Sequence, residues 1–124
     1  MIAADTSSLV AYFNGESGAD VDRVAEALAA AELVLPPVVV TEILSDPNGS
    51  ASIEHQIRQV QALEIRDGYW TRAAQARRTV RGHGLKAKLG DVLIAQSCID
   101  HRVTLITRDG DFRHFERYCG LRLA

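Results

Sequence analysis

Residues Gly90–Phe112 read GDVLIAQSCIDHRVTLITRDGDF, and this segment decides the fold of the chain. It begins with an acid, Asp91, in the first turn of an expected helix. Val103–Thr107 follows as an uninterrupted run of apolar residues and threonine, which predicts a strand. Two more acids, Asp109 and Asp111, come just after that strand. A helix that starts with an acid and a strand that ends in one can bring their carboxylates together at one edge of a sheet, which suits a divalent metal ion.

The rest of the chain alternates short apolar strands with amphipathic helices. Further strands are expected at Met1–Ala4, Leu33–Leu35 and Glu64–Ile65, with an edge strand at Leu121–Leu123. Helices and one loop are expected between them: helices at Ser8–Phe13, Gly18–Ala31, Val38–Leu44, Ile53–Leu63 and Trp70–Val80, and a loop at Ser45–Ser50. This alternation predicts an α/β fold built around a parallel sheet, whose ligands bind beyond the carboxyl ends of the strands.

Length and composition indicate a water-soluble protein with one domain, residues 1–124. Apolar residues make up 47% of the chain and charged residues 24%. No basic segment followed by an apolar core opens the sequence, and no apolar run approaches the roughly 18 residues of a membrane span. We therefore expect a cytoplasmic protein without membrane contacts. Cys98 and Cys119 lack CxxC spacing, which favours reduced structural thiols.

Charge is unevenly distributed, although the net charge is only −2. Residues 1–57 contain nine acids and one base, a net charge of −8. Residues 58–124 contain thirteen bases and seven acids, a net charge of +6. A basic half can attract phosphate even in a globally acidic protein. The alternative is that these arginines simply form the solvated faces of two helices.

Four acids are candidates for the carboxyl edge of the sheet. Asp5 follows the first strand and Asp109 the last, while Asp91 lies where the positive end of a helix favours a carboxylate. Glu42 lies among apolar neighbours in VVVTEIL, where a charge is costly to bury unless it is paired or bound to metal.

Each acid also has an ordinary structural explanation. A helix can turn Glu42 to solvent, Asp91 can cap its own helix, and Asp5 and Asp109 can form turns. Four acids gathered at one edge would, however, repel one another, and a cation or raised pKa values normally relieve that repulsion. Ligation by oxygen alone favours Mg²⁺ or Mn²⁺ over zinc, and no HxxxH or Cys/His set is present.

These residues together resemble the PIN domain, and most closely the VapC-type toxins of bacterial toxin–antitoxin pairs. The resemblance spans essentially the whole chain, with DVLIA followed by TRDGDF as its most specific part and DTS at Asp5–Ser7 as a weaker one. It implies an α/β/α sandwich with a central parallel sheet of four to five strands. No acid of the family's core set is missing from this sequence.

The resemblance also implies a Mg²⁺-dependent endoribonuclease that leaves a 5′-phosphate and a 3′-hydroxyl. Mn²⁺ is a possible substitute metal, and tRNA or ribosomal RNA is the usual substrate of such toxins. The family further implies a homodimer and a cognate VapB-type antitoxin that holds the enzyme inactive.

The family's site residues are carried over onto matching positions. The catalytic and metal-binding acids are Asp5, Glu42, Asp91 and Asp109, with Asp111 matching a fifth acid that is less constant in the family. Ser7 and Thr107 match hydroxyl groups that support the acids. Arg108 and Arg113 flank the acids and are the expected contacts to RNA phosphates.

Other classes of protein fit the sequence less well. A catalytically inert PIN-like protein- or RNA-binding module would usually have lost one of the acids. A HAD-like phosphotransferase or phosphatase with Asp5 as nucleophile would have a DxD pair, but the chain reads Asp5-Thr6-Ser7. A dinucleotide-binding enzyme would have GxGxxG after the first strand, and this motif is absent.

Overall fold

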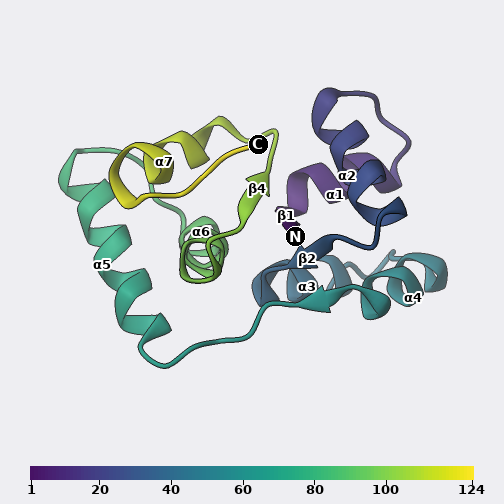
Figure 1. The fold of residues 1–124 in the computed structure, drawn as a ribbon, viewed down its shortest axis with the longest axis horizontal. Helices are drawn as coiled ribbons and strands as arrows, with labels where there is room; N and C mark the ends of the chain where they lie inside the picture. Colours follow the sequence, from purple (N-terminus) through teal and green to yellow (C-terminus); the bar gives the residue numbers. More distant parts are fainter.

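Four short parallel strands form the centre of the molecule in the computed structural model, which describes all of residues 1–124, and helices surround them (Figure 1). In chain order the elements are β1 (Ile2–Ala4), α1 (Thr6–Phe13), α2 (Ala19–Ala29), β2 (Leu33–Leu35), α3 (Pro37–Leu44), α4 (Ala51–Gln59), β3 (Gln61–Ala62), α5 (Tyr69–Gly82), α6 (Leu89–His101), β4 (Thr104–Ile106), the 3₁₀ helix η1 (Gly110–Phe112) and α7 (Arg113–Cys119). Helices α5, α6 and α7 group beyond β4, whereas α1 to α4 lie on the side of β1 to β3 (Figure 1). The expected PIN-like α/β/α architecture is confirmed, with four strands.

The order of the strands brings the two ends of the sequence together. The sheet runs β3-β2-β1-β4, and every pairing is parallel. Ile2 is opposite Leu33 on one side of β1, and Ala4 is opposite Ile106 on the other. Because parallel strands end at the same edge, the residues that follow β1 and β4 become neighbours there.

Burial explains why these short segments are strands. All three residues of β2 are buried, as are the last two of β1 and of β4. Strands covered on both faces read as continuous apolar runs rather than as alternating patterns. A cluster of 24 buried residues, including Leu105 and Phe115, fills the space between the sheet and its helices.

Local signals set the ends of several helices. The Asp5 side chain caps α1 by accepting a hydrogen bond from the Ser8 amide, and Ser50 caps α4 in the same way through Ile53. Pro37 opens α3, where its missing N–H costs nothing. Gly120 ends α7 in the left-handed conformation, with φ of 81°.

Polar contacts from buried or half-buried side chains fasten α5 to α6. Tyr69 is buried, and its hydroxyl donates to the Leu93 carbonyl oxygen at 2.6 Å. Arg72 makes two hydrogen bonds to the Asp100 carboxylate, at 2.9 and 2.7 Å. This bidentate pair draws the pKa of Asp100 below its ordinary value. The helix that carries Asp91 is thereby held against its neighbour.

Three expectations from the sequence are wrong or incomplete. The strand expected at Glu64–Ile65 lies instead at Gln61–Ala62, because α4 ends at Gln59 rather than continuing to Leu63. The edge strand expected at Leu121–Leu123 is reduced to one parallel bridge between Leu123 and Leu105. Helix α7 was not anticipated at all. The loop expected at Ser45–Ser50 is confirmed.

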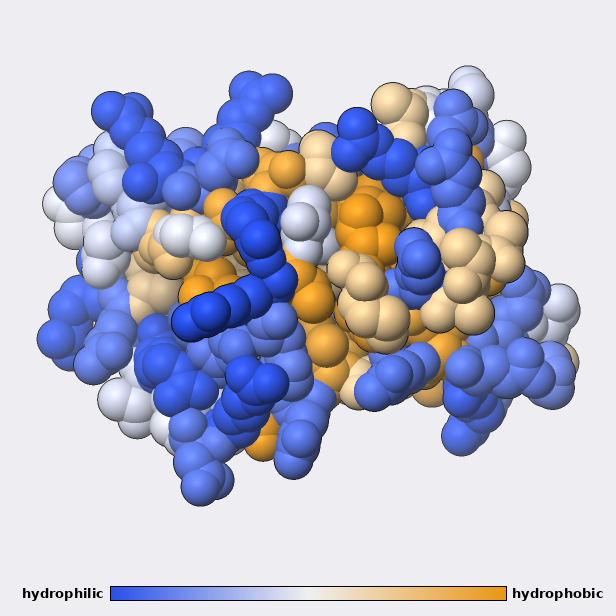
Figure 2. All heavy atoms as spheres, in the orientation of Figure 1, coloured by the Kyte–Doolittle hydropathy of each residue, from blue (hydrophilic) through white to orange (hydrophobic).

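Hydrophilic side chains project around the outline of the molecule, and hydrophobic atoms are visible between them near the middle of the face in Figure 2. None of the helices combines the length and the hydrophobicity that a bilayer-spanning segment needs.

Truncation of a buried side chain on strand β4 should unfold the protein more readily than an equal truncation at the surface. Leu105 is fully buried, so Leu105→Ala leaves a cavity and is expected to lower the free energy of unfolding by about 2–5 kcal/mol. Leu89 is 58% exposed, and Leu89→Ala is the matched control, with an expected change within about 0.5 kcal/mol. Urea denaturation measures both. Equal losses in the two variants would contradict the assigned core.

Candidate metal centre

Three carboxylates meet at the carboxyl edge of the sheet. Asp91, Asp109 and Asp111 each offer an oxygen atom, and these oxygens all lie within 4.8 Å of one another. All three residues are half-buried, so the oxygens remain accessible from solvent. Asp111, the less constant acid of the family pattern, is therefore one of the three that lie closest together.

The acids are attached to the N-terminal ends of helical elements. Asp91 lies in the first turn of α6. Asp109 caps η1, and one oxygen of its carboxylate accepts a hydrogen bond from the Asp111 amide at 2.9 Å. Asp5 caps α1. The partial positive charge at these helix ends favours carboxylates over neutral side chains at these positions.

Asp5 lies behind the three clustered acids and is almost fully buried, with 3% of its surface exposed. The Ser7 hydroxyl lies 2.9 Å from both of its carboxylate oxygens, and the Thr107 hydroxyl donates to it at 2.7 Å. The Thr107 oxygen in turn accepts from the Asp109 amide at 3.0 Å. Ser7 and Thr107 thus contact Asp5 as expected from the sequence, and Thr107 links Asp5 to the backbone of Asp109.

Burial and mutual repulsion make these acids hard to ionise. Burial raises the pKa of Asp91 to about 6, and the charge of Asp109 adds to the rise, while Lys88 opposes it. Burial also raises the pKa of Asp5, although hydrogen bonds from Thr107, Ser8 and Ser7 favour its charged form. A cation among these oxygens would relieve both effects.

The donor set fits a hard divalent cation. Every group that meets at the site is a carboxylate, and no cysteine or histidine belongs to the cluster. Oxygen ligands suit Mg²⁺, Mn²⁺ or Ca²⁺, whereas structural zinc sites use nitrogen and sulfur. Asp91, Asp109 and Asp111 could hold such an ion directly, with Asp5 as the charged group behind them.

Glu42 is placed apart from the three clustered acids. It lies on α3, is exposed, and accepts a hydrogen bond from the Thr6 hydroxyl at 2.8 Å. The contact joins α3 to the start of α1, directly after Asp5. Glu42 thus lies near the N-terminus of α1, but it does not belong to the cluster of Asp91, Asp109 and Asp111.

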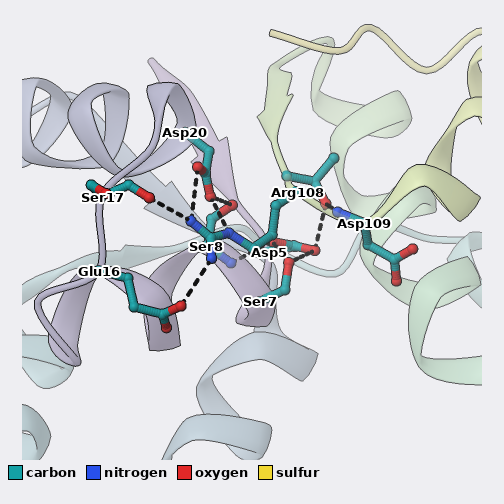
Figure 3. A network of polar contacts seen from close by, with 9 residues as sticks. Asp5, Ser7, Ser8, Glu16, Ser17, Asp20, Arg108 and Asp109 are labelled. Atoms are coloured by element: carbon teal, nitrogen blue, oxygen red, sulfur yellow. Dashed lines mark hydrogen bonds and ion pairs between the residues drawn. The ribbon is translucent and has the colours of Figure 1, made fainter.

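Arg108 faces away from the acid cluster. Its guanidinium donates to Asp20 at 2.8 and 3.1 Å and to Glu16 at 3.3 Å. In Figure 3 the Arg108 guanidinium and the Asp109 carboxylate extend to opposite sides of the backbone that joins these two residues. An RNA phosphate at Arg108 would therefore compete with two carboxylates. Arg113, by contrast, is exposed and forms no ion pair.

Several residues that shape the site carry no signal in the sequence. The Ser8 amide donates to the Asp5 carboxylate at 3.0 Å, and the Ser8 hydroxyl donates to Asp20 at 2.9 Å. Asp20 also binds Arg108, and this pairing lowers the pKa of Asp20 to about 2. Lys88, at the N-cap position of α6, opposes the rise in the pKa of Asp91 through its positive charge. No sequence signal links Asp20 to Arg108, which lie 88 positions apart.

Comparison with known families agrees with this geometry. The family model of the PIN domain matches residues 2–118. The chain belongs to the PIN-domain family. This membership supports a nuclease of the hydrolase class, in which metal dependence is typical. No curated protein sequence matches the chain.

Several solved structures share the PIN fold at low sequence identity. VapBC2 from Rickettsia felis bound to a DNA fragment from its promoter matches with 17% identity and a TM-score of 0.72, covering 100% of this chain and 98% of that chain. VapBC-1 from nontypeable Haemophilus influenzae matches with 20% identity, a TM-score of 0.72, and coverage of 100% and 97%. FitAcB from Neisseria gonorrhoeae matches with 19% identity, a TM-score of 0.72, and coverage of 99% and 96%. At these identities the comparison establishes the shared fold.

Removal of the Asp91 charge should stabilise the metal-free protein. The folded state holds the Asp91 proton more tightly than the unfolded state, because its pKa is raised to about 6. The stability that this proton contributes is therefore present below about pH 4 and lost as the pH rises through about 6. Asp91→Asn is expected to raise the Tm at pH 7.5 in EDTA, with a smaller rise at pH 4.5.

Differential scanning calorimetry at the two pH values measures the effect. Asp67→Asn is the matched control, because Asp67 is an exposed acid in the loop before α5. An Asp91→Asn variant with lower Tm than the parent at pH 7.5 would contradict a destabilising charge at this position.

The pair of Arg108 and Asp20 should stabilise the fold in a pH-dependent way. The pKa of Asp20 is lowered to about 2, so the stabilisation is present above about pH 4 and lost as the pH falls through about 2. Arg108→Gln is expected to lower the Tm at pH 6, with a smaller deficit at pH 3. Arg113→Gln, which breaks no ion pair, is the control and should leave the Tm unchanged. A constant Tm deficit of Arg108→Gln at both pH values would contradict this role.

Proposed function

We propose that this protein is a Mg²⁺-dependent endoribonuclease and the toxin of a VapBC-type toxin–antitoxin pair. The observation that carries the proposal is the convergence of Asp91, Asp109 and Asp111, with oxygens within 4.8 Å, at the edge where β1 and β4 end. Membership of the PIN-domain family supports the nuclease class of this reaction.

The acids have distinct tasks in this proposal. Asp91, Asp109 and Asp111 bind the cation, and Mn²⁺ could replace Mg²⁺ there. Asp5 adds negative charge from behind, in an orientation fixed by Ser7 and Thr107. Glu42, which lies apart from the cluster, reaches the site through water or through a movement of α3.

Hydrolysis needs no nucleophilic side chain in this arrangement. A divalent cation at the acids would supply a water of lowered pKa and positive charge against the leaving oxygen of the phosphodiester. The carboxylates would fix the position of the cation and therefore of its positive charge. Attack of the water on phosphorus would leave a 5′-phosphate and a 3′-hydroxyl. Arg113, exposed next to η1, is the proposed phosphate contact beside the acids, while Arg108 is a weaker candidate because acids already occupy its guanidinium.

The proposed partners follow from the fold relatives. VapBC and FitAcB are two-component complexes by their names, which supports a cognate VapB-type antitoxin for this chain as well. A homodimer and a tRNA or ribosomal-RNA substrate complete the proposal.

RNA cleavage tests the proposal directly. Purified protein is expected to cut an end-labelled structured RNA with Mg²⁺ or Mn²⁺ and to lose this activity in EDTA. Asp91→Asn is expected to lower the cleavage rate by at least about 100-fold, because it removes a charged ligand from the cation. Asp67→Asn, in an exposed loop, is the matched control for loss of one acid. Cleavage that persists in EDTA or in Asp91→Asn would contradict the proposed reaction, and a protein that binds RNA without any cleavage would favour the inert binding module.

Growth measurements test the pairing with an antitoxin. Expression of the toxin alone is expected to arrest growth, and co-expression of the small protein encoded beside it is expected to restore growth. Expression of the Asp91→Asn variant alone should leave growth unaffected. Equal arrest with and without the neighbouring protein would contradict the pairing.

A further inference from the structure

A groove between α5 and α6 is the largest cavity on the molecule, with a volume of about 760 Å³. Its floor is apolar, and two large hydrophobic side chains at its sides are mostly exposed: Trp70 at 64% and Leu89 at 58%. Trp70 is the only tryptophan of the chain. Large exposed hydrophobic side chains beside a groove mark a binding surface more often than a solvated face.

The charges at the groove are all positive. Arg77, Arg78 and Arg81 line it, and the lining contains no carboxylate. They follow Trp70 on one face of α5, at spacings of seven, eight and eleven residues. Arg77 uses its Nε to donate to the Ala87 carbonyl oxygen at 2.9 Å, whereas Arg78 and Arg81 form no ion pair. Two guanidinium groups therefore remain available to an anionic ligand.

Helix α6 forms one side of the groove and also carries Asp91 of the acid cluster. Leu89, Val92 and Leu93 form its α6 side, and Asp91 lies on the first turn of the same helix between Leu89 and Val92. Helices α5 and α6 run next to each other on one side of the molecule (Figure 1). The groove and Asp91 therefore share the N-terminal part of α6.

We propose that the α5–α6 groove binds single-stranded RNA and leads it to the carboxylates, an inference that rests on the nuclease function proposed above. A base stacks on Trp70, and Arg78 and Arg81 contact phosphates. Aromatic stacking combined with a positively charged groove is the usual means of binding single strands without reading a sequence. The groove thus supplies substrate affinity that the negatively charged acid cluster cannot provide.

A second copy of the chain fits the groove less well. A two-fold contact centred on this surface would bring the arginines of both copies together, and like charges at an interface oppose association. The phosphates of RNA are complementary to the same arginines.

Binding to a short single-stranded RNA of mixed sequence tests the inference, with the Asp91→Asn background used to prevent cleavage. Trp70 fluorescence is expected to be quenched as RNA is added. By anisotropy of a labelled RNA, Trp70→Ala should weaken binding about fivefold or more, and Trp70→Phe should retain most of the affinity. Replacing Arg78 and Arg81 together by Ala should reduce the slope of log K against log salt by about 1.4. Arg58→Ala, on helix α4, is the control for loss of an exposed arginine outside the groove and should change neither quantity.

The outcomes separate this inference from the proposed function. RNA binding that depends on Trp70, Arg78 and Arg81 supports the groove even if the parent protein cleaves no RNA, in which case the nuclease proposal alone fails. Metal-dependent cleavage with an unchanged KM in the groove variants, and no quenching of Trp70, overturns the groove and leaves the nuclease proposal standing. A dimer in light scattering that buries Trp70 without RNA would also overturn it, since the occupant would then be a second copy.

Discussion

Parallel pairing of β1 with β4 is the interaction on which the site depends. The ladder places Ile2 opposite Thr104 and Ala4 opposite Ile106, residues about 100 positions apart in the sequence. Asp5 and Thr107 follow these strands, and the hydrogen bond between their side chains at 2.7 Å closes the end of the ladder. Without this pairing the acids of the two chain ends could not share one edge. Burial, together with the nearby charge of Asp109, raises the pKa of Asp91, so the arrangement that would bind a cation is destabilising without one.

Most of this architecture could be predicted from the sequence because three of its four strands are largely buried and apolar. Leu33–Leu35 and the run around Thr104–Ile106 lack the alternation of apolar and polar residues that a half-exposed strand would show. A buried parallel strand is therefore the expected structure for both. The positions of Asp5, Asp91 and Asp109 followed in turn from the rule that parallel strands end at one edge. The family resemblance indicated that Ser7 and Thr107 support the acids, and in the structure both hydroxyl groups contact Asp5.

What the sequence did not reveal depends on contacts between distant residues or on weak local patterns. Strand β3 contains only Gln61 and Ala62, both exposed, and no hydrophobic pattern marks two such residues. Helix α7 spans seven residues directly after η1, and its burial through Phe115 depends on packing against α5. The pairing of Arg108 with Asp20 turned an expected phosphate contact into a contact within the protein. Such partners are set by tertiary structure alone.

Anomalous scattering from crystals grown with Mn²⁺ tests whether these acids form a metal site. We expect an anomalous peak at bonding distance from carboxylate oxygens of Asp91 and Asp109, with Asp111 bound directly or through water. Crystals of Asp109→Asn grown under the same conditions should lose the peak. A folded parent protein with no peak at these oxygens, or with one only elsewhere on the surface, would contradict the account.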